Sequence, residues 1–172
     1  TERMSSMTST LLEMSELRAI PCNDEIELAP LIEEVLADLA PLADQKGIAL
    51  ACRGNSLMSG SDPLMYRMMF NLVENAIRYS RPASTIDVTV DKEDDRVLIR
   101  IEDEGFGIPE QHRDSVFQPF FRVDKSRSRE YGGVGLGLSL VWEIATLHGG
   151  TIEVENSSSH GTVMLAALPK LG

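Results

Sequence analysis

The chain has 172 residues, enough for one domain with a well-buried core and a short appendage. Hydrophobic residues make up 42% of it and charged residues 25%, the ordinary balance of a globular protein. A net charge of −11 argues against nucleic-acid binding, and no apolar run is long enough to span a bilayer. We therefore expect neither nucleic acid nor membrane contact by this chain.

The cysteines and histidines give no support for a metal centre. Cys22 and Cys52 show no metal-type spacing, and His112, His148 and His160 are scattered. We expect two structural thiols in a reduced, intracellular protein, with a disulfide as the alternative.

A heptad-like apolar seam marks the N-terminal segment. Within residues 2–18, apolar side chains recur at spacings of three and four: Met4, Met7, Leu11 and Met14. The helix they predict is too short to be stable alone, so it should pack against a partner. A proline and an Asn-Asp pair then predict a linker over residues 21–25, between a helix within 1–20 and a main domain over 26–172.

Two helices and a strand are predicted next. Residues 30–43 have a helical period opened by a proline, and residues 48–52 have the pattern of a strand. Asp62 and Pro63 predict the start of the second helix, with Asp62 as the N-cap and Pro63 at the first helical position.

The second helix carries a polar stripe. Asn71, Asn75 and Arg78 are spaced i, i+4 and i+7, so they share one face. Amide oxygens beside an arginine suit a hydrated Mg²⁺ and the phosphates it carries, although such a stripe taken alone is more often an ordinary solvated face. The opposite arc is apolar and should face the core: Met65, Met68, Met69, Leu72, Val73 and Ala76.

The second half of the chain predicts four strands and a helix. Residues 86–90 and 97–101 alternate apolar with polar, which predicts a hairpin or an adjacent antiparallel pair. Residues 105–134 lack a period apart from a turn near 110–116, which is typical of a functional loop. The remaining predicted elements are a helix at 136–148, strands at 151–155 and 162–168, and a polar turn at 156–160. Helices and strands do not alternate regularly, so an α+β fold with helices on one sheet face is favoured.

Five short motifs follow one another along the chain. They are Asn-Leu-Val-Glu-Asn-Ala-Ile-Arg-Tyr at 71–79, Asp-Glu-Gly-Phe-Gly at 103–107, Phe-Gln-Pro-Phe-Phe-Arg at 117–122, Gly-Val-Gly-Leu-Gly at 133–137 and His-Gly-Thr at 160–162. In this order, and over roughly residues 25–169, they resemble the N box, first glycine box, F box, second glycine box and a shortened third glycine box of sensor histidine kinases. The resemblance implies the ATP-binding domain of that family. Its fold would be a two-layer α/β sandwich of the Bergerat type, with a mixed, mostly antiparallel sheet, helices on one face and an ATP lid at about 105–135.

The resemblance assigns Asp103 to the exocyclic amine of adenine. The alternative is a turn aspartate that binds its own backbone, which is common before glycine. Gly105 and Gly107 would permit close backbone approach and unusual dihedral angles at the start of the lid. Thr162 would orient the polar edge of the pocket.

The second glycine segment differs from better-known phosphate loops. It has neither the Lys-Ser/Thr of a P-loop nor the Rossmann spacing. As a glycine-rich entry into a helix, it would offer exposed amides to phosphates, with a ligand-free hinge as the alternative. The expected ATP-binding residues are Asn71, Asn75, Arg78, Tyr79, Asp103, Gly105, Gly107, Arg122, Lys125, Gly133, Gly135, Leu136, Gly137, Leu138 and Thr162.

Asn75 is the expected Mg²⁺ ligand, and the catalytic positions would be Asn71, Asn75, Arg122 and Lys125. In related ATPases of the gyrase and chaperone type, a glutamate that activates water stands where this chain has Asn71. An amide cannot act as a general base, so transfer to a protein is favoured over hydrolysis. Glu74 is a conceivable base, although it points elsewhere on the helix.

The resemblance therefore implies a histidine protein kinase. ATP with Mg²⁺ would donate its γ-phosphate to a histidine on a dimerisation domain, and a response-regulator aspartate would receive it in turn. The whole protein would be a homodimeric, membrane-anchored bacterial sensor, and this chain would be a cytoplasmic domain of it. This chain lacks the acceptor motif and should not phosphorylate itself. The alternatives are a serine kinase of the anti-sigma-factor type, a hydrolase, or a degenerate module that only binds a nucleotide or a partner.

Overall fold

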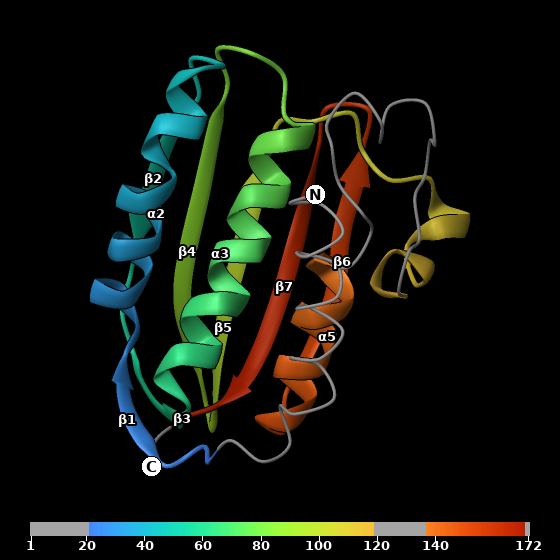
Figure 1. The fold of residues 1–172 in the computed structure, drawn as a ribbon. Helices are drawn as coiled ribbons and strands as arrows, with labels where there is room; N and C mark the ends of the chain where they lie inside the picture. The colour runs from blue at the N-terminus through green and yellow to red at the C-terminus, as the bar shows by residue number, and fades with distance from the viewer. Residues whose placement is uncertain (1–20, 119–136, 171–172) are drawn as a thin grey trace, which may run out of the picture.

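The fold has two layers, a sheet and a layer of helices that covers one of its faces (Figure 1). The computed structural model describes residues 21–118 and 137–170. The covering helices are α2 (Leu28–Asp44), α3 (Asp62–Tyr79) and α5 (Gly137–Leu147). This arrangement confirms the predicted α+β sandwich. The helix expected within residues 2–18 and most of the expected lid lie outside the described residues.

The main sheet has five strands in the order β2-β4-β5-β7-β6. The β2–β4 pair is parallel and the other pairs are antiparallel, as predicted for a mixed sheet. Its strands are β2 (Ala49–Arg53), β4 (Thr85–Glu93), β5 (Arg96–Asp103), β6 (Thr151–Ser158) and β7 (Gly161–Pro169). The β4–β5 hairpin has the alternation expected from the sequence: Val88 and Val90 are buried opposite Ile101 and Ile99, and Ile86 and Val97 are buried on the same face.

A second, two-stranded ribbon pairs β1 (Asp24–Glu27) with β3 (Leu57–Gly60) in antiparallel register. Neither strand was predicted, because four residues are too few for a visible period. β1 begins within the predicted linker of residues 21–25, so part of that segment is a strand. The division into domains otherwise stays a prediction.

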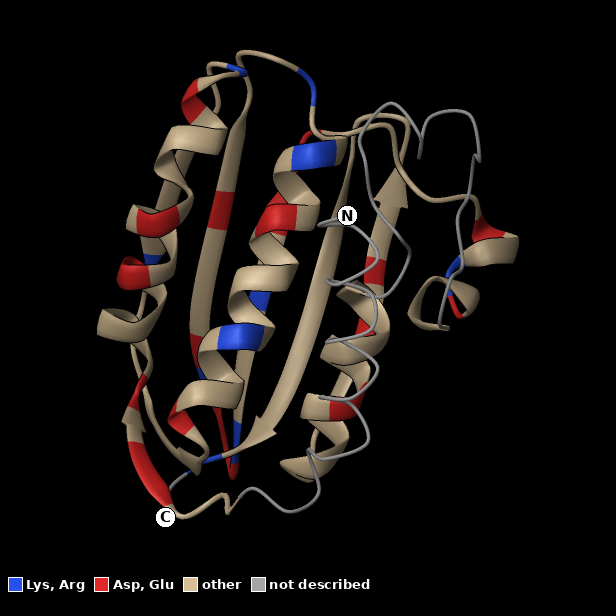
Figure 2. Ribbon diagram, in the orientation of Figure 1, with Lys and Arg blue, Asp and Glu red and all other residues tan. Residues whose placement is uncertain are grey.

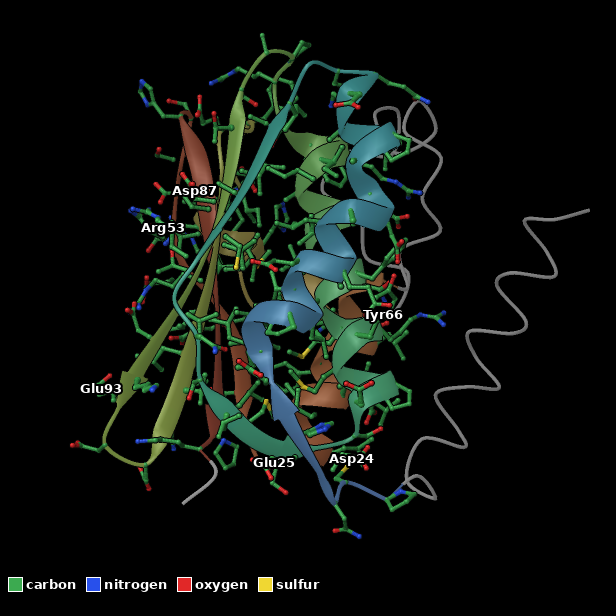
Figure 3. All side chains as sticks on the ribbon, turned by 90° about the vertical axis from the view of Figure 1, so that its left-hand side faces the viewer. Asp24, Glu25, Arg53, Tyr66, Asp87 and Glu93 are labelled. Carbon is green, nitrogen blue, oxygen red and sulfur yellow. The ribbon has the colours of Figure 1, made fainter. Side chains whose placement is uncertain are left out.

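The core lies between the sheet and the helices. The predicted apolar arc of α3 is buried throughout, with no member more than 3% exposed. The opposite face of the sheet is uncovered and polar: Figure 3 shows Arg53 and Asp87 pointing away from the helices. On this uncovered face Arg100 Nε donates to Glu155 Oε1 at 2.8 Å. A single-sided core is what a strand alternation of apolar and polar residues produces.

The start of α3 lies one residue earlier than predicted. Ser61, with an extended backbone, is the N-cap, and its Oγ accepts a hydrogen bond from the Leu64 N–H at 3.4 Å. Asp62 is therefore the first helical residue, where its carboxylate favours the positive end of the helix. Pro63 fits in the first turn because an N–H there has no intrahelical partner.

His148 joins the end of α5 to the start of α3. Its Nδ1 lies 2.7 Å from the Ile144 carbonyl oxygen, and its Nε2 accepts a hydrogen bond from the Ser61 N–H at 3.0 Å. The ring is 7% exposed and both nitrogens are engaged. A phosphoryl acceptor needs an accessible nitrogen, so this geometry does not suit His148 to that role.

Candidate functional site

Asp103 lies at the end of β5, beside the start of β7. Its Oδ1 accepts two backbone hydrogen bonds, from Gly105 N at 2.9 Å and from Thr162 N at 3.2 Å. The bond from Gly105 is the turn interaction expected of an aspartate before glycine. Within the described residues Asp103 Oδ2 has no hydrogen-bonding partner, so the turn leaves one carboxylate oxygen to accept from a ligand.

Burial raises the pKa of Asp103 from 3.8 to about 6. The two backbone N–H groups lower that pKa because they stabilise the carboxylate, whereas the negative charge of Glu102 adds to the rise. Desolvation is the largest effect, so the ionised carboxylate is energetically costly in the folded chain. A ligand that donates a hydrogen bond to Oδ2 would offset that cost.

Asp103, Thr162 and Ser157 form one polar row across three neighbouring strands. Asp103 pairs with Thr162, and Thr162 pairs with Ser157, in the antiparallel register of β5, β7 and β6. The hydroxyl oxygens of Ser157 and Thr162 are 2.8 Å apart, and both side chains are buried. Ser157 was missed because the sequence predicted a turn at 156–160, whereas β6 continues to Ser158.

The glycines after Asp103 hold the chain close to its neighbours. A Cβ at Gly105 would overlap the Tyr79 carbonyl oxygen, and Gly105 forms a β-bridge with Ser80 at the end of α3. Gly107 has a φ of +80°, and a Cβ there would overlap the Ser158 carbonyl oxygen. These close approaches join the loop after β5 to α3 on one side and to β6 on the other.

The polar stripe of α3 is half-buried. Asn71 Nδ2 donates to the Gly137 carbonyl oxygen at 3.4 Å, which brings the start of α5 beside α3. Asn75 has no hydrogen-bonding partner among the described residues, and Arg78 makes a 3.6 Å ion pair with Glu74. The amide oxygens of Asn71 and Asn75 are therefore left to bind a ligand.

The end of α3, the end of β5 and the start of β7 meet at the upper edge of the molecule in Figure 1. The helices differ in charge: α2 carries only acidic charges, whereas α3 carries two arginines together with Asp62 and Glu74 (Figure 2). One of these, Arg78, lies in the last turn of α3. A cation at this place favours an anionic ligand next to the polar stripe.

Lys46 supports this end of α3 and was not anticipated. Its Nζ donates to the carbonyl oxygens of Ile77, Arg78 and Ser80 at 2.9, 3.1 and 2.7 Å. These groups lack intrahelical partners at a helix end, and a cation also balances the helix dipole. Burial lowers the pKa of Lys46, consistent with a partly desolvated ammonium group.

We predict that Lys46→Met lowers the free energy of unfolding by about 1–2 kcal/mol, because three carbonyl groups lose a charged donor. Lys92→Met, which replaces an exposed lysine of β4, is the matched control and should stay within about 0.5 kcal/mol of the unaltered chain. Urea denaturation of both variants measures the difference. Equal losses would mean that the cap contributes nothing beyond a surface charge.

The phosphate end of the site is only partly described. Arg122, Lys125, Gly133, Gly135 and Leu136 lie outside the described residues, so their expected roles stay predictions. Gly137 and Leu138 open α5 beside Asn71. Phe117 of the F-box segment is 7% exposed and packs against Trp142, with ring centroids 5.9 Å apart. It is therefore a packing residue rather than an exposed stacking surface.

The described residues contain no group of three or more His, Cys, Asp or Glu side chains that could hold a metal ion by itself. Mg²⁺ commonly keeps several waters and takes one or two protein oxygens together with substrate phosphates. The amide oxygens of Asn71 and Asn75 fit that donor set and would not be expected to retain the ion without a phosphate. None of the described helices is long and apolar enough to cross a membrane.

A family model described as "Histidine kinase-, DNA gyrase B-, and HSP90-like ATPase" matches residues 60–172, and the chain belongs to this ATP-binding family. SenX3 of Mycobacterium tuberculosis, a sensor-like histidine kinase, is 32% identical over 174 residues, which cover 98% of this chain and 42% of SenX3. The sensor histidine kinase CusS of Escherichia coli O157:H7 is 34% identical over 174 residues, which cover 99% of this chain and 36% of CusS.

Solved structures agree with these relatives. The mycobacterial sensor histidine kinase MprB has a TM-score of 0.75 at 25% identity, over 86% of this chain and 97% of the MprB chain. The catalytic domain of the histidine kinase ThkA also has a TM-score of 0.75, at 27% identity, over 86% of this chain and 95% of the ThkA chain. Within the family, this chain is the ATP-binding catalytic domain of a sensor histidine kinase. It spans less than half the length of SenX3 and CusS.

Proposed function

We propose that the chain binds ATP as its Mg²⁺ complex and presents the γ-phosphate to a histidine on a dimerisation domain outside this chain. The observation that carries the proposal is the buried Asp103 carboxylate, whose Oδ1 is held by two backbone N–H groups while Oδ2 is left to accept. The exocyclic amine of adenine is a donor that matches this oxygen. Guanine presents a carbonyl oxygen at the same ring position, which the carboxylate repels.

The polar stripe of α3 would bind the phosphate end of the nucleotide. Asn75, supported by Asn71, would hold the Mg²⁺ carried by the phosphates, and Arg78 would contribute a fixed positive charge. The bound ion neutralises the charge on the phosphate oxygens. Arg122 and Lys125 are proposed to contact the γ-phosphate. The amides of the second glycine segment would surround the remaining phosphates, and they are those of Gly135, Leu136, Gly137 and Leu138.

Two contacts favour transfer over hydrolysis. Asn71, at the position of the water-activating glutamate in the related hydrolases, donates its N–H to Gly137 and cannot remove a proton. Glu74 is paired with Arg78 at 3.6 Å, so its carboxylate already has a cationic partner. Neither group supplies a general base to activate water, so we expect the γ-phosphate to be transferred to a protein nucleophile rather than to water.

The proposed partners follow from the proposed transfer of the γ-phosphate to a histidine. The dimerisation domain of the parent protein would supply the acceptor histidine within a homodimer, and a response-regulator aspartate would take the phosphoryl group from it. The names of SenX3 and CusS support a sensor kinase, for which we propose a membrane-anchored protein with this domain in the cytoplasm.

A labelling experiment tests the proposal. The chain is incubated with γ-³²P-ATP and Mg²⁺, alone and with a histidine-kinase dimerisation domain supplied in trans. We expect base-stable, acid-labile label on the added domain and none on this chain. Label on His112, His148 or His160 would contradict the assignment, label on serine would favour a serine kinase, and steady phosphate release would favour a hydrolase. Calorimetric titration with ATP, with and without Mg²⁺, establishes nucleotide binding independently.

A further inference from the structure

Ser157 faces the core because of an irregularity in β6. The register shifts between Val154 and Asn156, so one extra residue interrupts the alternation of the strand. Val154 faces the helices, Asn156 is exposed and Ser157 is buried next to it. The bulge thereby places a hydroxyl group directly opposite Thr162, at the end of the row that begins with Asp103.

The Ile108 N–H favours one direction for the hydrogen bond between Ser157 and Thr162, whose two hydroxyl groups could each be the donor. The Ile108 N–H donates to Ser157 Oγ at 2.6 Å, so Ser157 must place its own hydrogen elsewhere. Among the described residues the acceptor within reach is Thr162 Oγ1, at 2.8 Å. If Ser157 donates to Thr162, the hydroxyl hydrogen of Thr162 is left to donate to a ligand.

Ser157 is also held by its backbone. Its carbonyl oxygen accepts a hydrogen bond from Arg113 Nη2 at 2.8 Å, and its Oγ is fixed by the Ile108 N–H. Both donors come from the segment that follows the first glycine box. The orientation of the Ser157 hydroxyl is therefore imposed from two sides, and a preorganised hydrogen bond loses little entropy on binding.

We propose that Ser157 is a positioning residue that determines base specificity by fixing Thr162 as a hydrogen-bond donor. This inference rests on the proposed binding of ATP. Asp103 Oδ2 then accepts from the adenine amine, and Thr162 donates to the adjacent ring nitrogen N1, directly or through one water. Guanine and hypoxanthine present the reverse pattern, a carbonyl oxygen beside an N–H. Their carbonyl oxygen would face the acceptor Asp103 Oδ2, and their N–H would face the donor hydroxyl of Thr162.

The test uses a ligand that lacks only the ring acceptor. 1-Deaza-ATP keeps the amine but replaces N1 by a C–H group. We expect the unaltered chain to bind ATP about tenfold more tightly than 1-deaza-ATP, the effect of one hydrogen bond. In Ser157→Ala the Thr162 hydroxyl is no longer directed, and the ratio of the two dissociation constants should fall toward one. A purely structural role would weaken both ligands equally and leave the ratio unchanged.

Ser159→Ala is the matched control, because Ser159 is an exposed serine in the turn that follows β6 and its ratio should stay near ten. If Ser157→Ala does not fold, Ser157→Cys fills the site with a somewhat larger group that is a much weaker donor, and its ratio should also fall. A ratio of one in the unaltered chain, or an unchanged ratio in the Ser157 variants, would overturn the inference and leave ATP binding intact. Failure of the unaltered chain to bind ATP would overturn the proposed function as well.

Discussion

Replacing Asp103 with asparagine is expected to weaken ATP binding on the order of 100-fold, because a buried hydrogen bond to a charged group is lost. Asparagine can keep its Oδ1 as the acceptor for Gly105 and Thr162, so the turn is preserved. Its NH₂ group then occupies the place of Oδ2 and directs a donor toward the donor amine of adenine. Calorimetric titration with ATP measures the loss.

The same variant is expected to be more stable than the unaltered chain when no nucleotide is bound. Burial raises the pKa of Asp103 from 3.8 to about 6, which means that ionising this carboxyl in the folded state at neutral pH has a cost. Removing the charge should recover on the order of 1–3 kcal/mol. For a chain of this length, each kcal/mol raises the melting temperature by about 2–4 °C. Thermal denaturation followed by circular dichroism measures the change.

The stability of the folded chain and its affinity for ATP should depend on pH in opposite directions. Between about pH 4 and pH 6 the folded chain holds the Asp103 proton more tightly than the unfolded chain, so this group contributes less stability as the pH rises. ATP binding needs the carboxylate, so affinity should increase through pH 6 and level off above it. The difference between the unaltered chain and Asp103→Asn isolates both effects from other titrating groups.

Asp87→Asn is the matched control, since Asp87 lies on the uncovered face of the sheet (Figure 3). It should change neither ATP affinity nor the pH profile. If Asp103→Asn bound ATP as tightly as the unaltered chain, Oδ2 would not be the adenine acceptor. If it were less stable, the charge itself would be needed to hold Gly105 and Thr162.

The helices and strands that were correctly predicted have apolar residues that recur at regular spacing along the element. The apolar alternation of β4 and β5 and the methionine-rich arc of α3 depend on local spacing and survive in the structure. β1 and β3 were missed because each has four residues and gains its order by pairing with the other. Ser61 and Asp62 are both good N-caps, so the sequence alone could not decide which one begins α3.

Some residues of the candidate site could be predicted from the sequence, and others could not. The motifs pointed to Asp103, Gly105 and Thr162, and the structure brings these three together. Lys46 was missed because its carbonyl partners lie more than thirty residues away in the sequence, and only tertiary packing brings them together. Ser157 was missed because a bulge reverses the alternation of buried and exposed residues in β6, and the local sequence does not predict the bulge.

Replacing Gly105 with alanine is expected to cost about 1–3 kcal/mol of stability and to weaken ATP binding. The added Cβ would overlap the Tyr79 carbonyl oxygen and lie 2.9 Å from Asp103 Oδ1. The first of these atoms is backbone at the end of α3, where Lys46 holds the neighbouring carbonyl groups. The loop after β5 would therefore have to move, and Asp103 Oδ1 would lose the Gly105 N–H. Urea denaturation and calorimetric titration measure the two effects.

Gly137→Ala is the matched control for stability, because a Cβ there would meet no atom of the described residues within 4 Å. Alanine is favoured over glycine in a helix by about 0.5–1 kcal/mol, so this variant should be at least as stable as the unaltered chain. Opposite signs for the two glycines would show that close approach to Tyr79, rather than the loss of a glycine as such, destabilises Gly105→Ala. A tolerated Gly105→Ala with unchanged ATP affinity would mean that the loop does not need to lie against α3, and that Asp103 is positioned by Thr162 alone.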